Sequence, residues 1–298
     1  NVDWLYIDAD EAHVALQFHK NKGDLTKAEN GVKNNGLITK MVCVYEGKEE
    51  ETMYSKRRVL TNRHFFCGVN SGEANLKFWD DIYGYLERNY DLGQVKRIYL
   101  NADGGSWIKA GAKRLKGVTY VLDGFHLEKY LAKLVPHLKR KERIPVLEEF
   151  RKTIRNQTKD DFRELVEKQK KEMPKWRSRT KVEEAAEYIL SNWTAAKLRL
   201  RHKEGVLGSS TESHVSHILS ARMSSRPMGW SRKGAAKMAE LRAYFFNGGN
   251  MLELVRYQKN VGIEEEKKEE KILSSTEILK SEKNRHGELG KYLERISH

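Results

Sequence analysis

The sequence predicts an α/β fold: a mixed sheet of three antiparallel strands followed by parallel strands, with a large all-α insertion and a helical C-terminus. Three observations predict it. Strand-like runs with hairpin connections occupy the sequence up to residue 68. Helical and buried-strand patterns then alternate from residue 72 to residue 122, which indicates right-handed crossover units. From residue 125 to about residue 203, helical periodicity continues with almost no strand signal.

The opening segment predicts three strands in antiparallel pairing. Residues 4–18 are rich in aromatic and branched side chains, which is typical of a strand. Residues 20–36 are polar and rich in Gly and Asn, so we expect a loop or a long hairpin connection there. Residues 37–45 and 55–68 predict the second and third strands, with a turn at residues 46–47.

The next segment predicts two helices that alternate with two buried strands. Residues 72–90 place Leu, Trp, Ile and Tyr at helical spacing. Residues 95–101 and 118–122 are short apolar runs, which favour buried parallel strands. Residues 106–115 favour a helix between them, with Ser106 as a candidate N-cap.

The rest of the chain is predicted to be helical. Residues 127–205 form the expected all-helical insertion, with prolines near the helix starts. A flexible link follows, and helices resume at Thr211. Residues 231–246 predict a basic helix, and residues 251–298 predict a helical C-terminal extension.

The composition points to a polyanionic partner. Lys and Arg together number 56 against 42 Asp and Glu, which gives a formal net charge of +14. A surplus of this size is expected of a protein that binds nucleic acid, although charge alone is not specific. Cys43 and Cys67 are too few for a disulfide framework or a four-cysteine zinc site, and we interpret them as small core residues in a reducing compartment. We expect neither a membrane span nor a secretory signal. Because a strand-like run directly follows Asn1, we expect a piece of a longer protein.

Three acidic residues lie where such a fold would bring them together. Asp10 and Asp103 each end a strand-like run, and Glu212 begins a helical stretch. Carboxylates at strand ends and on a nearby helix can converge on hard cations, and Mg²⁺ prefers oxygen ligands. Two such ions, about 3.5–4 Å apart, can stabilise both the attacking and the leaving oxygen of a phosphodiester displacement. Each acid alone also has a structural explanation: a strand end, a tight turn, or a first-turn helix carboxylate favoured by the helix dipole.

Three further residues are candidates for supporting positions. Asp8 lies two residues before Asp10, so both should face the same side of a strand. Asp123 repeats the strand-then-acid arrangement and is also a candidate helix N-cap. His126 suits contact with a phosphate or a leaving oxygen, and a structural hydrogen bond at the helix start is an equal alternative.

Two other groups of side chains suggest ligands. His214 and His217 face one side of a helix, but their spacing is not that of a His-Glu-x-x-His motif and no third soft ligand lies nearby, which disfavours zinc. The segment from residue 222 to residue 233 combines cations, hydroxyls and an aromatic ring suited to phosphates and unpaired bases. Its candidate DNA-binding residues are Arg222, Arg226, Trp230, Arg232 and Lys233. The alternative is a solvated loop with one buried Trp.

Several motifs occur together in a fixed order. They are residues 8–17 (DADEAHVALQ), 103–108 (DGGSWI), 122–129 (LDGFHLEK), and 211–217 (TESHVSH) continuing to 222–231 (RMSSRPMGWS). Together they resemble the DDE transposases of the ISLre insertion-sequence group, which are relatives of the Mutator-like transposases. The resemblance covers residues 1 to about 250.

The resemblance implies an RNase H-like fold, with its core in residues 1–126 and 206–250 and the helical insertion between them. It also implies that Asp10, Asp103 and Glu212 are the catalytic acids and the ligands of two Mg²⁺ or Mn²⁺ ions. Choosing Asp10 over Asp8 as the acid of the first strand rests on this resemblance. The remaining auxiliary residues, Asp123 and His126, match the Asp-x-x-His motif that Mutator-like enzymes carry after the fifth strand.

The implied function is metal-dependent DNA cleavage and strand transfer of an insertion sequence, by a catalytic region without the family's N-terminal DNA-binding part. One alternative is a repurposed RNase H-like nuclease, which cuts but does not join. Another is a catalytically inactive DNA-binding transposase remnant. The expected partners are transposon ends and target DNA, bound by a homodimer or a higher oligomer, with no membrane involved. The expected location is the bacterial cytoplasm, at the nucleoid when the protein is on DNA.

Overall fold

The structure is a computed structural model. It describes residues 2–27, 31, 34–55, 57–174, 179–202, 205–207, 211–226 and 228–257, with the backbone alone at residues 211 and 212. The contacts divide the chain into two units, residues 1–247 and residues 248–298. In the second unit, residues 251–257 are helical, and the predicted extension beyond residue 257 lies outside the described residues.

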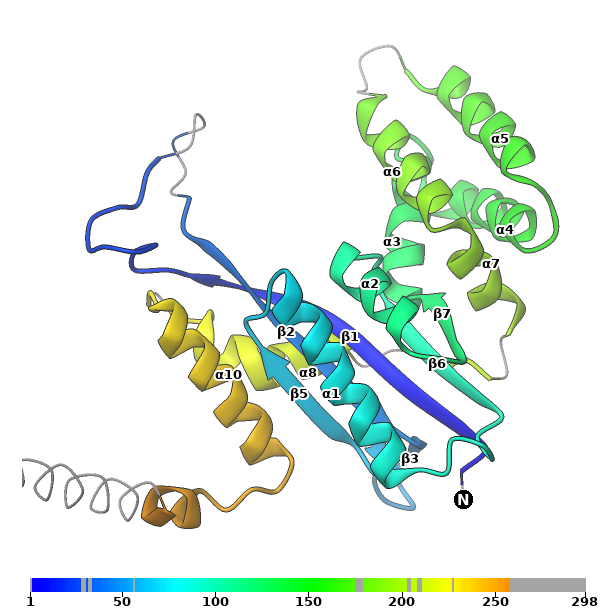
Figure 1. The fold of residues 1–298 in the computed structure, drawn as a ribbon. Helices are drawn as coiled ribbons and strands as arrows, with labels where there is room; N and C mark the ends of the chain where they lie inside the picture. Colours follow the sequence, from blue (N-terminus) through cyan, green and yellow to red (C-terminus); the bar gives the residue numbers. More distant parts are fainter. Residues whose placement is uncertain are drawn as a thin grey trace, which may run out of the picture. The chain divides into compact units, whose positions relative to one another are not determined.

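A mixed five-stranded sheet forms the centre of the first unit (Figure 1). In spatial order its strands are β5 His64–Gly68, β2 Gly36–Tyr45, β1 Trp4–Ala15, β6 Arg97–Ala102 and β7 Val118–Leu122. β1 pairs antiparallel with β2, and β2 pairs antiparallel with β5. β1 pairs parallel with β6, and β6 pairs parallel with β7. The predicted α/β class with a mixed sheet is confirmed.

The predicted third strand, residues 55–68, is in fact two strands. β4 Arg58–Thr61 pairs with β3 Gly47–Glu50 in a separate two-stranded sheet, and β5 alone joins the main sheet. The chain turns between β4 and β5 at Asn62, whose φ of 45° is in the left-handed region. Asn tolerates this conformation because its short polar side chain can bond locally. The sequence pattern alone did not distinguish this turn from a continuous strand.

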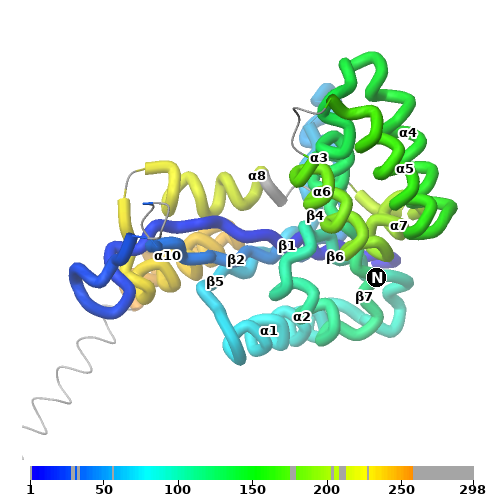
Figure 2. The backbone as a smooth tube through the Cα atoms, turned by 90° about the horizontal axis from the view of Figure 1, so that it is seen from above, coloured from blue at the N-terminus to red at the C-terminus, as the bar shows by residue number. Residues whose placement is uncertain are grey.

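Helices cover both faces of the main sheet. α1 Glu73–Asn89 and α2 Ser106–Arg114 pack against one face, and Figure 2 shows them on the side opposite α8. The side chains of Leu5 and Ile7 join the core under α1 and α2, whereas Tyr6 joins the core of the other face. This alternation follows from the period of two in a strand. Ser106, the predicted N-cap, is instead the first helical residue, and Gly105 occupies the cap position.

A helical segment follows β7 and has an apolar core of its own. Its helices are α3 Gly124–Leu134, α4 Arg140–Asn156, α5 Lys159–Glu172, α6 Thr180–Ser191 and α7 Trp193–Arg201. Phe150, Phe162 and Trp193 meet edge to face in this core. Between residues 124 and 202, no strand occurs among the residues that the structure describes. The boundaries of the predicted insertion and core parts stay predictions.

The chain then returns to the main sheet. α8 Thr211–Val215, the π-helical turn η1 Ser216–Ser220, α9 Ala221–Met223 and α10 Arg232–Phe246 follow in order. α8 and η1 contact β1, and α10 contacts β2 and β5. Ser231 caps α10 by accepting the Gly234 N–H at 3.0 Å. Within the described part of the chain, no helix is both long enough and apolar enough to span a lipid bilayer.

Candidate active site

Three acids lie in line across three neighbouring strands. Asp103 and Asp123 directly follow β6 and β7, whereas Asp10 lies within β1, which continues to Ala15, and does not end its strand as the sequence suggested. Asp8 on β1 pairs with Asn101 on β6, so Asp10 and Asp103 occupy matching positions two residues further along. Ala102 pairs with Leu122 on β7, and the next residue, Asp123, donates its N–H to the Ala102 carbonyl at 2.8 Å. Neighbouring strands are about 4.8 Å apart. The parallel pairing therefore aligns Asp10, Asp103 and Asp123 in one row, which we call the acidic row.

Asp8 and Asn101, which lie two positions before Asp10 and Asp103, show which side of the sheet the acidic row faces. The Asn101 amide donates to the Asp8 carboxylate at 2.7 Å. Two residues earlier on each strand, Tyr6 and Tyr99 stack with their ring centroids 5.9 Å apart. Since side chains alternate along strands, Asp10 points to the same side as Asp8. This is the side that α8 and α10 cover.

Burial makes Asp10 a weaker acid than usual. Its pKa is raised to about 6, first because the carboxyl is removed from water and also because of the nearby charges of Asp103 and Glu11. A hydrogen bond from the Glu11 N–H at 2.8 Å and the charge of His126 oppose the shift. The Asp10 carboxylate is therefore held next to a like charge, an arrangement that a bound cation would relieve.

This shift predicts that Asp10→Asn stabilises the protein. A raised pKa in the folded state means that the folded form holds its proton more tightly, so stability falls as the pH rises from about 4 to about 6 and stays lower above that. In the absence of metal ions, Asp10→Asn should raise the free energy of unfolding by about 1–2 kcal/mol at pH 8 and by little at pH 4. Urea unfolding at the two pH values measures this difference.

Asp24 provides a control of opposite sign. Its carboxylate accepts the backbone N–H groups of His19, Lys20 and Asn21 at 2.6–2.8 Å, and these bonds hold its pKa at about 2. The stability from these bonds is present above the unfolded pKa and is lost as the pH falls toward 2. Asp24→Asn should therefore destabilise the protein at pH 8, and the loss should shrink in acid. Destabilisation by Asp10→Asn at pH 8 would contradict the account of Asp10.

The loop after β6 holds Asp103 from two sides. Its carboxylate accepts the Gly105 N–H at 3.0 Å, and its carbonyl accepts a short hydrogen bond from the Tyr188 hydroxyl on α6. Gly104 has a φ of +101°, and a Cβ there would lie 2.8 Å from Oδ1 of Asn192. The loop therefore requires glycine at this position, and the helical segment helps to fix the Asp103 backbone.

Asp123 and His126 form a bonded pair at the start of α3. The Asp123 carboxylate accepts the His126 N–H at 3.1 Å and lies 3.2 Å from its Nδ1. Burial opposes ionisation of Asp123, but these bonds prevail and lower its pKa. The same bond raises the pKa of His126, against the effect of burial, and the charges of Asp103 and Asp10 add to it. The His126 ring therefore binds a proton more tightly than a free imidazole, and it lies next to the acidic row.

The helix that carries Glu212 packs on the same side of the sheet. α8 contacts β1, and its last residue, Val215, joins the apolar cluster that contains Tyr6. The Glu212 side chain lies outside the described residues, so its approach to Asp10 and Asp103 stays a prediction. Among the side chains that are described, no three His, Cys, Asp or Glu residues are grouped so that they could hold a metal ion.

A family model described as "Uncharacterised protein family (UPF0236)" matches residues 1–261. The chain belongs to UPF0236. Curated relatives in Caldanaerobacter subterraneus subsp. tengcongensis include UPF0236 protein TTE0402 and UPF0236 protein TTE2489. Each is 35% identical over 250 residues, which is 84% of this chain and 46% or 48% of the relative. This UPF0236 chain thus spans about half the length of the curated relatives it matches.

Asp8 differs from Asp10 in being fully buried. Its carboxylate accepts hydrogen bonds from the Tyr45 hydroxyl at 3.1 Å and from the Asn101 amide at 2.7 Å. In the UPF0236 chain these bonds tie β1 to β2 and to β6. Asp8 therefore supports the strands that carry the acidic row, and it is shielded from solvent where Asp10 is only partly buried.

The predicted DNA-binding segment is partly exposed and partly packed. Arg222, Arg226, Arg232 and Lys233 are exposed. Trp230 is half-buried against the core, and its indole N–H donates to the Met223 carbonyl at 3.0 Å. Its backbone also bridges to Leu16. The indole thus has a structural function, which favours the buried-Trp alternative at this position, while the four cations remain accessible.

The two helix histidines of the UPF0236 chain lie in different surroundings. His214 is half-buried with its ring 5.4 Å from that of Phe65, and burial lowers its pKa to about 4 with help from the charges of Arg63 and Lys48. His217 is exposed.

Sequence reasoning missed the residues that position the Asp103 loop from other elements. Trp107 donates its indole N–H to Glu11 at 2.8 Å, and the Lys40 ammonium lies 4.9 Å from its ring centroid. Tyr188 and Asn192 reach the loop from the helical segment. Trp107 belongs to a motif that the sequence did single out, but no local pattern indicates which helix of the segment faces the loop.

Proposed function

We propose that this chain is the catalytic region of a DDE transposase of an insertion sequence, which cleaves DNA and joins DNA strands with Mg²⁺ or Mn²⁺. The acidic row carries the proposal. Asp10 and Asp103 occupy matching positions on two parallel strands, and α8, which carries Glu212, packs on the side of the sheet that Asp10 faces. Asp103 directly follows the carboxyl end of β6, and open α/β folds place their sites at the carboxyl ends of their strands.

The order of the strands supports an RNase H-like core. In chain order the main sheet consists of β1, β2, β5, β6 and β7. The first three pair antiparallel, and the fourth and fifth add in parallel on the other side of the first. The resemblance implies acids on the first strand, the fourth strand and a late helix. Asp10, Asp103 and Glu212 lie on or directly after these elements.

The residues present fit a hard divalent cation. Carboxylate oxygens are the ligands that Mg²⁺ prefers, and the charge of Asp103 helps to raise the pKa of Asp10. Asp10, Asp103 and Glu212 would hold the metal, which supplies charge stabilisation for the attacking and leaving oxygens of a phosphodiester. Asp123 orients His126 through two hydrogen bonds, so that the Nε2–H of the ring can meet a phosphate oxygen. The basic net charge and the exposed cations from Arg222 to Lys233 suit the DNA backbone.

The printed names of two relatives support a gene that is present in several copies, as a mobile gene is. One UPF0236 relative carries eleven TTE designations in its printed name, and another carries four. We interpret joined designations as one protein encoded at several places in one strain. Several copies per genome are what an insertion sequence would produce.

The experiment that tests the proposal uses a full-length UPF0236 relative together with this chain. The DNA substrate carries the ends of the sequence that is repeated around the copies of the relative's gene. Nicking at these ends that requires Mg²⁺ or Mn²⁺, followed by joining to a second duplex, is the expected result. Nicking without joining would indicate the nuclease alternative. DNA binding without nicking by the full-length protein would indicate the inactive remnant.

Metal binding itself predicts a shift in thermal stability. A ligand that binds only the folded state at about 100 times its Kd stabilises it by about 2.7 kcal/mol. Mg²⁺ should therefore raise the Tm of the chain in a thermal unfolding scan. Asp103→Asn should abolish most of the rise, whereas Asp91→Asn, in the exposed turn before β6, should keep it. An equal rise in both variants would place the metal elsewhere.

A further inference from the structure

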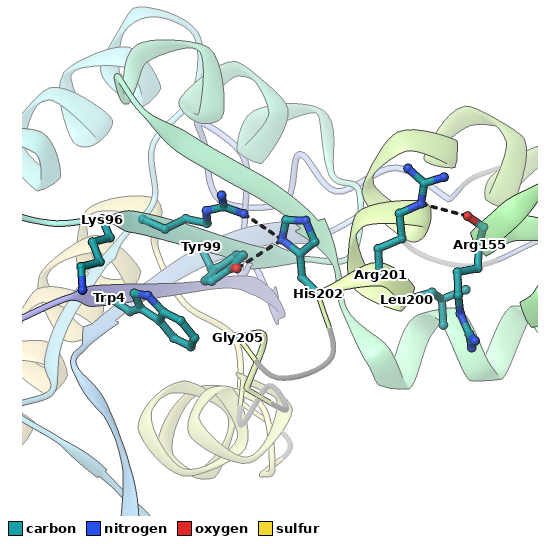
Figure 3. Close-up of a pocket in the computed structure, with 9 residues that line it drawn as sticks. Trp4, Lys96, Tyr99, Arg155, Leu200, Arg201, His202 and Gly205 are labelled. Carbon is teal, nitrogen blue, oxygen red and sulfur yellow. Dashed lines mark hydrogen bonds between the residues drawn. The ribbon is translucent and has the colours of Figure 1, made fainter.

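A cavity of about 590 Å³ opens at the other ends of the strands, away from the acidic row. Trp4 and Arg97, which pair with each other, are the first residues of β1 and β6 and lie at its edge. Figure 3 shows His202 between Tyr99 on the sheet side and Arg201 on the helix side. The lining residues are Trp4, Lys96, Arg97, Tyr99, Arg155, Leu200, Arg201, His202 and Gly205. We call this the cationic pocket.

The pocket gathers positive charge with little compensation. Four of its side chains are Lys or Arg, and none is Asp or Glu. Among the described residues, Lys96 is the one of these cations that pairs with a carboxylate, that of Asp3 at 2.7 Å.

His202 lies where these charges meet. Its Nδ1 is 3.0 Å from the Arg97 guanidinium and 3.2 Å from the Tyr99 hydroxyl, so this nitrogen accepts and the ring is neutral. Burial lowers the pKa of His202, and the charges of Arg97 and Arg201 lower it further. The guanidinium of Arg201 also donates from Nε to the Arg155 carbonyl at 2.9 Å, which fixes its position. The Arg97 guanidinium is therefore held against His202, and Arg201 is anchored on the helix side of the pocket.

We propose that the cationic pocket binds the phosphate group of a nucleotide, either free or within a DNA strand. Arg97 and Arg201 present the planar donors that match phosphate oxygens. Trp4, with 37% of its surface exposed, provides an aromatic face for a base. The cavity is many times larger than a single water-sized ion needs, and the exposed ring of Trp4 favours a ligand with a base over a bare anion. The pocket lies toward the opposite ends of β1 and β6 from the acids, so binding here is separate from the proposed chemistry.

The His202 ring reports whether a phosphate binds in the cationic pocket. A bound phosphate supplies negative charge next to His202, so its pKa should rise on binding. The full chain is titrated in low salt without divalent ions, and the imidazole resonances are followed by NMR, with His202→Gln used to assign the signal. The three probes are pyrophosphate, thymidine 5′-monophosphate and a short 5′-phosphorylated oligothymidylate. Each should shift the His202 resonance and raise its pKa.

Single variants distinguish binding in the cationic pocket from a general attraction of the probes to positive charge. Arg97→Gln and Arg201→Gln should each weaken binding of all three probes about tenfold or more, because each removes charge-assisted hydrogen bonds. Arg88→Gln removes the same charge from the exposed end of α1 and should bind like the unchanged chain. Trp4→Leu should weaken the two base-containing probes about tenfold and leave pyrophosphate unchanged.

The results of these titrations do not depend on whether the protein nicks DNA. Tighter binding of the oligonucleotide than of the mononucleotide assigns the pocket to a DNA strand, and equal binding assigns it to a free nucleotide. The proposal is overturned if no probe shifts the His202 resonance at millimolar concentration, or if Arg97→Gln and Arg201→Gln bind as Arg88→Gln does. Loss of nicking in Asp103→Asn with intact phosphate binding here would show that the two sites are independent.

Discussion

Asp103→Asn is expected to lower the rate of metal-dependent DNA nicking by about a thousandfold or more while DNA binding is retained. Asn keeps the shape of the side chain and can still accept the Gly105 N–H, so the loop should keep its conformation. It removes one negative ligand, and a bound metal typically contributes several kcal/mol to the stabilisation of the transition state, which corresponds to this loss in rate. Binding should persist or tighten, because a charge that repels phosphate is gone.

The same loss is expected for Asp10→Asn and for Glu212→Gln. Asp8→Asn should be milder, because the Asp8 carboxylate is fully buried and holds Tyr45 and Asn101. The rate is measured on end-containing DNA with Mg²⁺ or Mn²⁺ in the full-length relative at the equivalent positions, beside a binding measurement in the same salt.

Asp80→Asn is the matched control. It removes a half-exposed carboxylate on α1 that pairs with Arg114, on the opposite face of the sheet. This variant should nick at the normal rate. Full nicking by the Asp103 or Glu212 variant would show that Asp10, Asp103 and Glu212 are not the catalytic acids. A strong loss in Asp8→Asn without a loss in Asp10→Asn would show that the first strand contributes the other acid.

The largest effect on stability is expected from Gly111→Ala. Gly111 lies on α2 directly against the fully buried Trp79 of α1, and a Cβ at this position would overlap the indole ring. The indole cannot move freely, because its N–H donates to the Trp107 carbonyl at 3.1 Å. Overpacking of this kind costs about 1–3 kcal/mol, and displacement of Trp79 would also disturb the loop that carries Asp103. Urea unfolding measures the cost.

Gly84→Ala is a control at another helical glycine. A Cβ at Gly84 meets only the flexible end of Arg88, at 3.1 Å from Nη1, so the higher helix propensity of Ala should stabilise the protein by up to about 1 kcal/mol. The double variant Trp79→Phe with Gly111→Ala should lose less than the sum of its two single variants, because Phe lacks the overlapped part of the indole. If Gly111→Ala unfolds at the same urea concentration as the unchanged chain, the packing of α1 on α2 is looser than described.

The acidic row could largely be predicted from the sequence, because Asp103 and Asp123 follow short apolar runs that are typical of buried parallel strands. The sequence did not show that β1 continues beyond Asp10 to Ala15. Strand periodicity also placed Asp8 and Asp10 on one side. It could not show that Asp8 is covered, because the covering groups, Tyr45 and Asn101, come from other strands.

Other features depend on contacts that no local pattern encodes. The Tyr188 hydroxyl meets the Asp103 carbonyl across 85 residues of sequence. The division of residues 55–68 into two strands depends on the left-handed conformation of one residue, Asn62. The cationic pocket combines the start of β6 with the end of α7, and neither segment carries a recognisable motif.

The helix that covers one side of the sheet is synthesised long after the central strand. β1 lies at the centre of the sheet and leaves the ribosome before the other strands, but its parallel neighbour β6 begins only at residue 97. The apolar side of β2 and β5 is covered by α10, which ends at Phe246. Contacts this distant in sequence form slowly, because a long loop must close before they give any stabilisation. A nascent chain therefore exposes an apolar sheet surface for most of its translation. Chains that terminate before Arg232 are expected to aggregate or be degraded instead of persisting as partly folded proteins.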